Sequence, residues 1–135
     1  MLSIHAKQRL SQGLLLMLAT FAFAGNAFAA EVPFDRTQFV AAQATGKPIL
    51  VRFHATWCST CRAQEPVIAE LLAAPENKDV TAFLVDFDAQ KDVVKNFEVP
   101  MQSTLVVVKG ENEVSRTIGE TRKDALAAEI AKARL

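Results

Sequence analysis

The chain has 135 residues, and its 15 Lys and Arg residues balance 15 Asp and Glu residues, so the formal net charge is +0. This balance gives no sign of nucleic acid or an anionic membrane surface as a partner. Only two cysteines are present, which excludes a small domain held together by several disulfides.

The first 29 residues are typical of a secretory signal peptide. Basic residues near the start are followed by a short apolar run over residues 13–24 and then by Ala27-Phe28-Ala29. This run is shorter than the ~20 residues that span a bilayer, although an uncleaved N-terminal anchor is the alternative. We therefore expect a signal peptide over residues 1–29, cleavage after Ala29, and one exported domain over residues 30–135.

In chain order, the first half of this domain predicts a helix, a strand and a second helix. The first helix opens within residues 34–39, where Asp35 can act as N-cap. Residues 48–53 are mostly apolar and suit the centre of a sheet. The second helix should run over residues 58–74, and Pro66 should bend its axis.

The second half adds a strand, a short helix, a β-hairpin and a last helix. Residues 80–86 form the strand, and residues 90–97 form the short helix with Asp88 as cap. The hairpin occupies residues 104–118, and Thr121 caps the last helix. This order predicts an α/β domain, in which one mixed sheet with a parallel part is covered by helices on both faces.

The motif Cys58-Ser59-Thr60-Cys61 lies where the first strand passes into the second helix. Unpaired N–H groups and the helix dipole at a helix N-terminus stabilise a thiolate, so Cys58 is the expected attacking sulfur. Cys61, one turn later and more buried, can then attack the mixed disulfide and release the substrate. Half of a zinc site has the same spacing, but the chain has no second cysteine pair to complete it.

Several of these features together resemble the thioredoxin family. They are Trp57 with the two cysteines, the preceding Ile49-Leu50-Val51-x-Phe53-x-Ala55, the kinking Pro66, and Thr104-Leu105 followed by Gly110. The resemblance implies a thioredoxin fold and an enzyme that exchanges its Cys58/Cys61 dithiol with protein thiols and disulfides, with no cofactor.

Among family members, the chain is most similar to extracytoplasmic ones, especially the periplasmic C-terminal domain of the membrane thiol transporter DsbD. That domain has a glutamate four residues after its second cysteine, as this chain has Glu65. The resemblance implies a monomeric periplasmic reductant that receives electrons from a membrane thiol donor. It also implies that Trp57 forms part of the wall of the substrate groove.

One departure from the family is Arg52, which replaces a buried aspartate that accepts a proton from the second cysteine. An arginine cannot act as a base, so this role is vacant or falls to Glu65. A buried cation would favour thiolates over thiols. Alternatively, Arg52 pairs with Glu65 or Asp86, or extends to water.

A second departure is Ser103, where the family has a cis-proline. A non-proline cis bond costs about 2.5–4 kcal/mol, so we expect a trans Gln102–Ser103 peptide. We expect Gln102 and Ser103 to bind substrate, Ser103 through its backbone.

The family proline also keeps metals away from the thiolates, so its absence leaves an alternative function open. This is a copper-binding or copper-delivery module that uses Cys58 and Cys61, with or without His54 as a third ligand. Ser103→Pro is then expected to weaken metal binding and to preserve thiol exchange.

Overall fold

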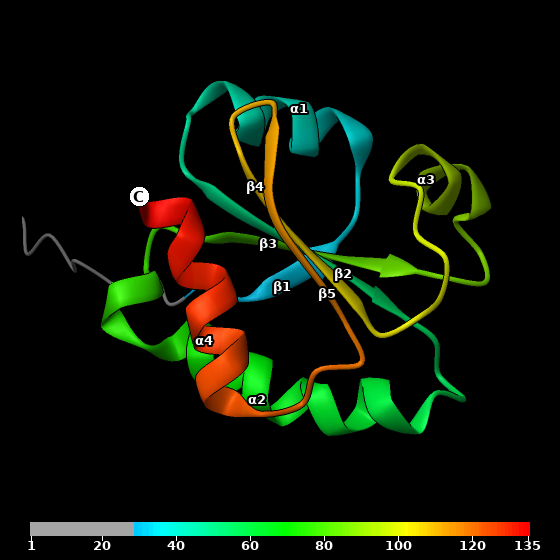
Figure 1. Cartoon of the computed structure of the whole chain (residues 1–135). Coiled ribbons are helices and arrows are strands. Elements are labelled where there is room, and N and C mark those ends of the chain that lie inside the picture. Colours follow the sequence, from blue (N-terminus) through cyan, green and yellow to red (C-terminus); the bar gives the residue numbers. More distant parts are fainter. Residues whose placement is uncertain (1–28) are drawn as a thin grey trace, which may run out of the picture.

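The computed structural model describes residues 29–135, which form a mixed five-stranded sheet in the order β1-β3-β2-β4-β5 (Figure 1). The pairs β1–β3 and β3–β2 are parallel, whereas β2–β4 and β4–β5 are antiparallel. The predicted parallel part and C-terminal hairpin are thus confirmed. The strands are Glu31–Pro33 (β1), Pro48–His54 (β2), Thr81–Asp86 (β3), Thr104–Lys109 (β4) and Asn112–Ile118 (β5).

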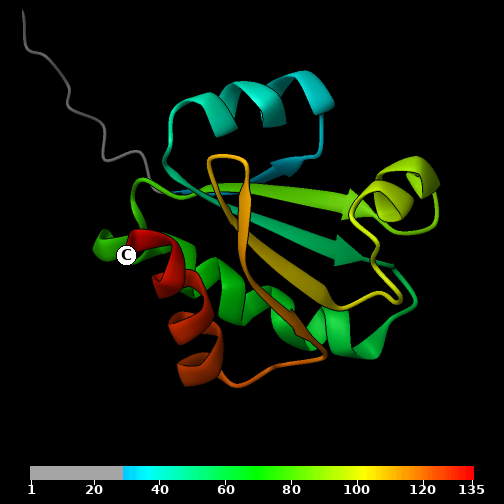
Figure 2. The same ribbon diagram turned by 45° about the horizontal axis from the view of Figure 1, so that its top comes forward.

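Helices cover both faces of the sheet, as the turned view in Figure 2 also shows. Helices α1 (Arg36–Ala44) and α3 (Lys91–Asn96) lie on one face, and α2 (Ser59–Ala73) and α4 (Lys123–Ala131) lie on the other. Two 3₁₀ turns follow α2 and α4, at Pro75–Asn77 (η1) and Lys132–Arg134 (η2). None of the helices between residues 29 and 135 is long and apolar enough to cross a membrane.

The sheet separates two apolar cores, because successive side chains of a strand point to opposite faces. In β2, Val51 and Phe53 pack against the side of α1 and α3, whereas Leu50 packs against α2 and α4. β2 is thus a central strand that is buried on both faces. The chain leaves this strand directly into the two cysteines, so the sheet fixes where they lie.

Helix α1 begins as predicted, because the carboxylate of Asp35 accepts a hydrogen bond from the N–H of Gln38 at 2.9 Å. The rings of Phe34 and Phe39 lie 5.4 Å apart across this start. Gly46 follows the helix with φ +66, a left-handed conformation that glycine adopts without strain.

The predicted cap at Asp88 is wrong. Helix α3 begins at Lys91, and its N-cap residue Gln90 makes no side-chain cap bond. The carboxylate of Asp86 instead accepts hydrogen bonds from the N–H groups of Asp88 and Ala89, each at 2.9 Å. The side chain at the end of β3 therefore closes this turn before the helix starts.

The predicted cap at Thr121 is also wrong, for a similar reason. Helix α4 begins at Lys123 with Arg122 as N-cap residue. The carboxylate of Glu120 accepts hydrogen bonds from the N–H groups of Thr121 and Arg122 at 2.9 and 2.8 Å. As at Asp86, an acidic residue that precedes the expected cap accepts the hydrogen bonds of the N–H groups in the turn.

Strand β1 was not predicted, and it extends the sheet beyond β3. Its residues Glu31 and Val32 pair with Ala82 and Phe83. The expected signal peptide lies outside the described residues except for Ala29, which packs partly buried against the core under α2 and α4.

Candidate active site

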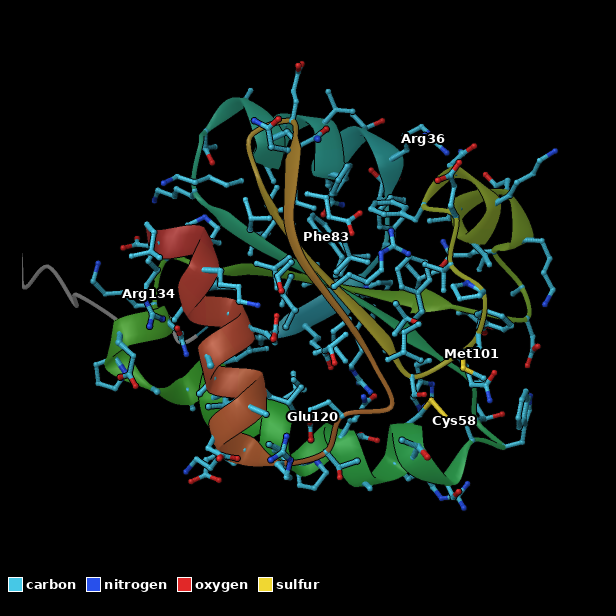
Figure 3. All side chains as sticks on the ribbon, viewed as in Figure 1. Arg36, Cys58, Phe83, Met101, Glu120 and Arg134 are labelled. Carbon is cyan, nitrogen blue, oxygen red and sulfur yellow. A yellow bond between two sulfur atoms is a disulfide. The ribbon has the colours of Figure 1, made fainter. Side chains whose placement is uncertain are left out.

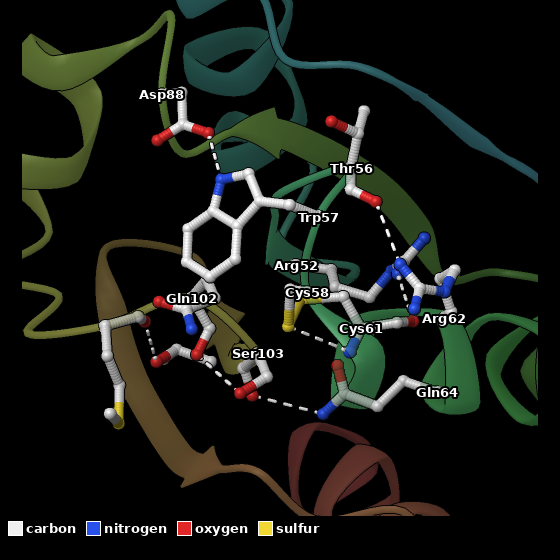
Figure 4. Close-up of a disulfide and its surroundings, with 12 residues drawn as sticks. Arg52, Thr56, Trp57, Cys58, Cys61, Arg62, Gln64, Asp88, Gln102 and Ser103 are labelled. Carbon is white, nitrogen blue, oxygen red and sulfur yellow. Dashed lines mark hydrogen bonds between the residues drawn. A yellow bond between two sulfur atoms is a disulfide. The ribbon is translucent and has the colours of Figure 1, made fainter.

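The two cysteines form a disulfide at the N-terminus of α2, with their Cα atoms 5.2 Å apart (Figures 3 and 4). Cys58 is the N-cap residue, and its Sγ accepts a hydrogen bond from the N–H of Cys61 at 3.1 Å. The same bond would stabilise a Cys58 thiolate in the reduced protein, in addition to the helix dipole.

The two cysteines differ in their access to solvent. Cys58 is 4% exposed and Cys61 is 0% exposed, and both pack with Ala55 and the partly buried Phe87. A substrate disulfide can therefore reach Cys58 first. This order agrees with the expected roles of an outer attacking sulfur and an inner resolving sulfur.

Trp57 lies beside the disulfide with 59% of its surface exposed. Its Nε1 donates a hydrogen bond to Asp88 at 2.7 Å, which ties the ring to the loop before α3 (Figure 4). Met101 is 47% exposed and lies at the same end of the molecule as Cys58 (Figure 3). These side chains supply apolar surface next to the reactive sulfur.

Arg52 is buried behind the active-site helix, with 2% of it exposed. Its Nε and Nη2 donate to the two carboxylate oxygens of Glu31 at 2.6 and 2.7 Å, and its Nη1 donates to the carbonyl of Cys61 at 3.5 Å. The predicted partners Glu65 and Asp86 are therefore wrong, because β1 brings Glu31 to this face of the sheet.

Ser103 adopts a left-handed conformation with φ +63, and no peptide bond between residues 29 and 135 is cis. The predicted trans Gln102–Ser103 bond is confirmed. The N–H of Ser103 donates to the carbonyl of Phe53 at 2.8 Å, and its carbonyl accepts from the N–H of Gly119 at 2.9 Å. Ser103 thus joins the end of β2 to the end of β5.

These bonds change what is expected of Ser103. Its backbone N–H and carbonyl are both used inside the fold, so they are not offered to a substrate strand. A proline at this position would have φ near −65° and no N–H, which conflicts with both the backbone angle and the bond to Phe53. Both conflicts argue against the expectation that Ser103→Pro preserves thiol exchange, which stays a prediction to be measured.

Gln64 is a site residue that the sequence analysis missed. It is 0% exposed, and its Nε2 donates to the carbonyls of Ser103 and Glu120 at 3.1 and 2.9 Å. It follows Cys61 and precedes Ile68 at helical spacing on the buried face of α2. A polar residue on this otherwise apolar face was the available signal.

Glu65 and His54 lie apart from this buried network. Glu65 is exposed on α2, one turn after Cys61. His54 is half-buried at the end of β2, where it pairs in register with Asp86. In the part of the chain that the structure describes, no group of three or more His, Cys, Asp or Glu side chains could hold a metal ion.

Two carboxylates beside the site have lowered pKa values. The pKa of Glu120 falls to about 2, first because of the hydrogen bond from the Arg122 side chain and then because of that from the Arg122 N–H. The pKa of Asp86 is lowered mainly by the N–H of Ala89 and then by that of Asp88. Both carboxylates stay ionised at neutral pH and hold the turns before α3 and α4.

Comparison with known proteins agrees with this site. The family model described as Thioredoxin matches residues 31–132. Thioredoxin from Mycobacterium tuberculosis (strain ATCC 25618 / H37Rv) is 36% identical over 86 residues, which cover 64% of this chain and 73% of the relative. Thioredoxin H-type from Fagopyrum esculentum is 38% identical over 94 residues, or 70% of this chain and 78% of the relative. The solved structure of Trxlp from Edwardsiella tarda EIB202 has a TM-score of 0.71 and 40% identity, covering 73% of this chain and 96% of that one.

The chain belongs to the thioredoxin family. The expected thioredoxin fold is confirmed, and the redox-active pair is Cys58 and Cys61. The protein is a thiol-disulfide oxidoreductase that acts on protein thiols and disulfides.

Proposed function

We propose that the protein is an exported, periplasmic reductant that takes electrons from a membrane thiol donor and passes them to protein disulfides. The signal-peptide pattern of residues 1–29 supports export. The similarity to DsbD, which includes Glu65, supports a reducing member with a membrane partner.

The main observation behind the proposed mechanism is that the two cysteines at the N-terminus of α2 are unequally buried, Cys61 more than Cys58. The Cys58 thiolate attacks one sulfur of the substrate disulfide, and the other substrate sulfur leaves and takes up a proton. Cys61 loses its proton and attacks Cys58, which releases the second substrate thiol. The substrate gains two electrons, and the protein ends with the Cys58–Cys61 disulfide.

The charges behind the disulfide support the reducing direction. A strongly oxidising member of this class has a stabilised reduced form, and an unpaired Arg52 would stabilise thiolates in that way. Glu31 neutralises Arg52 through two short hydrogen bonds, so the net charge behind Cys61 is small. We expect a reduction potential near the thioredoxin value of about −270 mV.

Equilibration of the purified protein with dithiothreitol and glutathione redox series tests this direction. A potential near that of a strong oxidant, about −120 mV, would contradict the reducing role and leave thiol exchange itself intact.

Export is tested separately by expressing the full chain in a Gram-negative bacterium and fractionating the cells. Recovery from the periplasm of a protein whose measured mass corresponds to residues 30–135 supports the proposal. Recovery of the uncleaved chain from the cytoplasm contradicts it. Sedimentation of the recovered protein tests the proposed monomer.

Substrate contacts are proposed for Trp57, Gln102 and Ser103. Trp57 offers an exposed ring, and no hydrogen bond within residues 29–135 uses the N–H of Gln102. Ser103 has its backbone engaged, so it would contact substrate through its hydroxyl, which donates to the carbonyl of Gln102 and can still accept a hydrogen bond. Trp57→Ala should raise KM for a protein disulfide and leave exchange with dithiothreitol nearly unchanged.

Glu65 is proposed to exchange a proton with Cys61. Because Glu65 is exposed and Cys61 is 0% exposed, this transfer requires local opening beside α2 that admits solvent to Cys61. Glu65→Gln should shift the pH dependence of disulfide exchange, and an unchanged profile would remove Glu65 from the mechanism.

A further inference from the structure

Gln64 places a fully buried amide on the same helical face as Cys61, three residues after it. A helical side chain extends toward the preceding turn, which here is the turn that carries the inner cysteine. Figure 4 shows the amide oxygen of Gln64 turned toward Cys61 and its nitrogen turned toward Ser103.

The orientation of this amide is fixed by its partners. Nε2 donates to the carbonyls of Ser103 and Glu120, and a flipped amide would point its oxygen at two other oxygens. Within residues 29–135, Oε1 of Gln64 is the buried side-chain atom that has no hydrogen-bond partner. Buried polar atoms are nearly always paired, so an orphan acceptor requires an explanation.

The oxidised state of the cysteines explains the orphan acceptor, because the sulfurs of a disulfide carry no hydrogen to donate. When the Cys58–Cys61 bond is reduced, the inner sulfur gains a proton and becomes an S–H donor. This donor forms one helical turn before the orphan acceptor, on the same buried face of α2, in a place closed to solvent because Cys61 is 0% exposed. The oxidised structure therefore lacks the hydrogen bond that the reduced structure can make.

We propose that Gln64 is a positioning residue whose Oε1 accepts the S–H of reduced Cys61 while its Nε2 holds the Ser103 loop. The proposal rests on the redox function of the cysteine pair. In the reducing step, a donor dithiol gives two electrons and two protons, becomes a disulfide, and leaves Cys58 and Cys61 as thiols. Gln64 neither donates nor accepts an electron; it stabilises the reduced form.

The first consequence concerns the reduction potential. Gln64→Leu removes the unpaired oxygen from the oxidised form and the S–H partner from the reduced form, and both changes favour the disulfide. We expect the equilibrium with dithiothreitol to move about tenfold toward the disulfide, which is ~30 mV for a two-electron couple. Gln64→Met, which keeps the length of the side chain, should give the same direction.

Asn77 offers a matched control for loss of a buried amide. It is 3% exposed at the far end of α2, where its Nδ2 donates to the carbonyl of Leu71 at 2.8 Å and its oxygen accepts from Arg134. Asn77→Ala should lower stability without moving the potential. An equal shift in Asn77→Ala would show that the Gln64 effect is a general result of destabilisation and would overturn the proposal.

The second consequence concerns the substrate loop. Loss of the Nε2 bonds frees Ser103 from α2, so KM for a protein disulfide such as insulin should rise in Gln64→Leu, with little change in kcat. Unchanged KM and potential in both Gln64 variants would overturn the proposal.

A spectroscopic test uses the wild-type protein and so does not depend on the folding of a variant. The ¹³Cδ signal of Gln64 should move downfield on reduction, because its carbonyl gains a hydrogen-bond donor, and should move back on reoxidation. A signal that does not move downfield would overturn the proposal. Failure of the wild-type cysteines to equilibrate with dithiothreitol would instead contradict the redox function, which keeps the two failures distinguishable.

Discussion

Behind Cys61 the chain buries a guanidinium and matches it with a carboxylate from the edge of the sheet. Arg52 is 2% exposed and the side chain of Glu31 is 17% exposed, so water screens this pair weakly. Burying two charges costs desolvation energy, which close geometry and several hydrogen bonds must offset. The bidentate contact and the bond to the Cys61 carbonyl meet that condition.

Removal of one partner of this pair should be more harmful than removal of both. Glu31→Gln leaves a buried, unpaired guanidinium and should lower the free energy of unfolding by about 3–5 kcal/mol. The double variant Glu31→Gln/Arg52→Met should recover most of that loss, because an apolar side chain needs no counter-charge. Urea denaturation of the three proteins measures this, and a loss below about 1 kcal/mol in Glu31→Gln would show that the pair is unimportant.

The two cysteines should give opposite results in a trapping experiment. Cys61→Ser keeps the attacking sulfur but cannot resolve the mixed disulfide, so substrate proteins should accumulate covalently bound to Cys58. Cys58→Ser leaves only the sulfur that is 0% exposed and should trap almost nothing. Non-reducing gels of both variants, expressed at equal levels, measure the difference. Equal trapping would contradict the assignment of Cys58 as nucleophile.

At the scale of elements, local patterns predicted most of the helices and strands, because caps, apolar runs and turn residues act over a few neighbours. Strand β1 was not predicted, because its three residues are too few to show an alternating apolar pattern and because they adjoin the expected signal peptide. For the same reason Glu31 was not predicted as the partner of Arg52, since the two residues are 21 positions apart in sequence. Such pairing depends on the β1-β3-β2 order, which a local pattern does not contain.

The site residues also fall into those that a local motif predicted and those that only long-range contacts place. The cysteine pair and Trp57 belong to one short motif and were found from it. The contact of Gln64 with Ser103 spans 39 residues and exists only because α2 and the start of β4 meet in the fold. The left-handed angle of Ser103 is imposed by its bonds to the ends of two strands and has no signal in the serine itself.

The loop before β4 should therefore tolerate glycine at Ser103 and reject proline. Glycine adopts φ +63 freely, so Ser103→Gly should be neutral or about 1 kcal/mol more stable. Ser103→Pro loses the N–H that pairs with the carbonyl of Phe53 and should cost at least about 1–3 kcal/mol. Thermal unfolding of the oxidised proteins measures both. A stable Ser103→Pro variant with full exchange activity would show that this loop can adopt another backbone.

For the molecule as a whole, the carboxylates with lowered pKa values determine how stability depends on acid. The largest cause of the lowering is a hydrogen bond in each case: from a side chain for three of them (Lys78, Arg116 and Arg122) and from a backbone N–H for the fourth (Ala89). The group comprises Asp79, Asp86, Glu113 and Glu120. In each case the folded protein holds its carboxylate charged at a pH where the unfolded chain already binds a proton. Unfolding then takes up protons, so stability increases with pH in this range.

The stabilising effect of Glu120 should be fully present above pH 4.5, its ordinary pKa, and should be lost as the pH falls toward about 2, its pKa in the folded protein. Urea midpoints measured between these limits should fall steadily for the wild type. Glu120→Gln removes this titrating group and keeps a side chain of the same length, so its midpoints should fall less steeply over the same range. Glu65→Gln is the matched control, because it makes the same substitution at an exposed glutamate whose side chain has no hydrogen bond or ion pair within residues 29–135, and its profile should follow the wild type. Parallel profiles for Glu120→Gln and the wild type would show that Arg122 does not hold Glu120 ionised in solution.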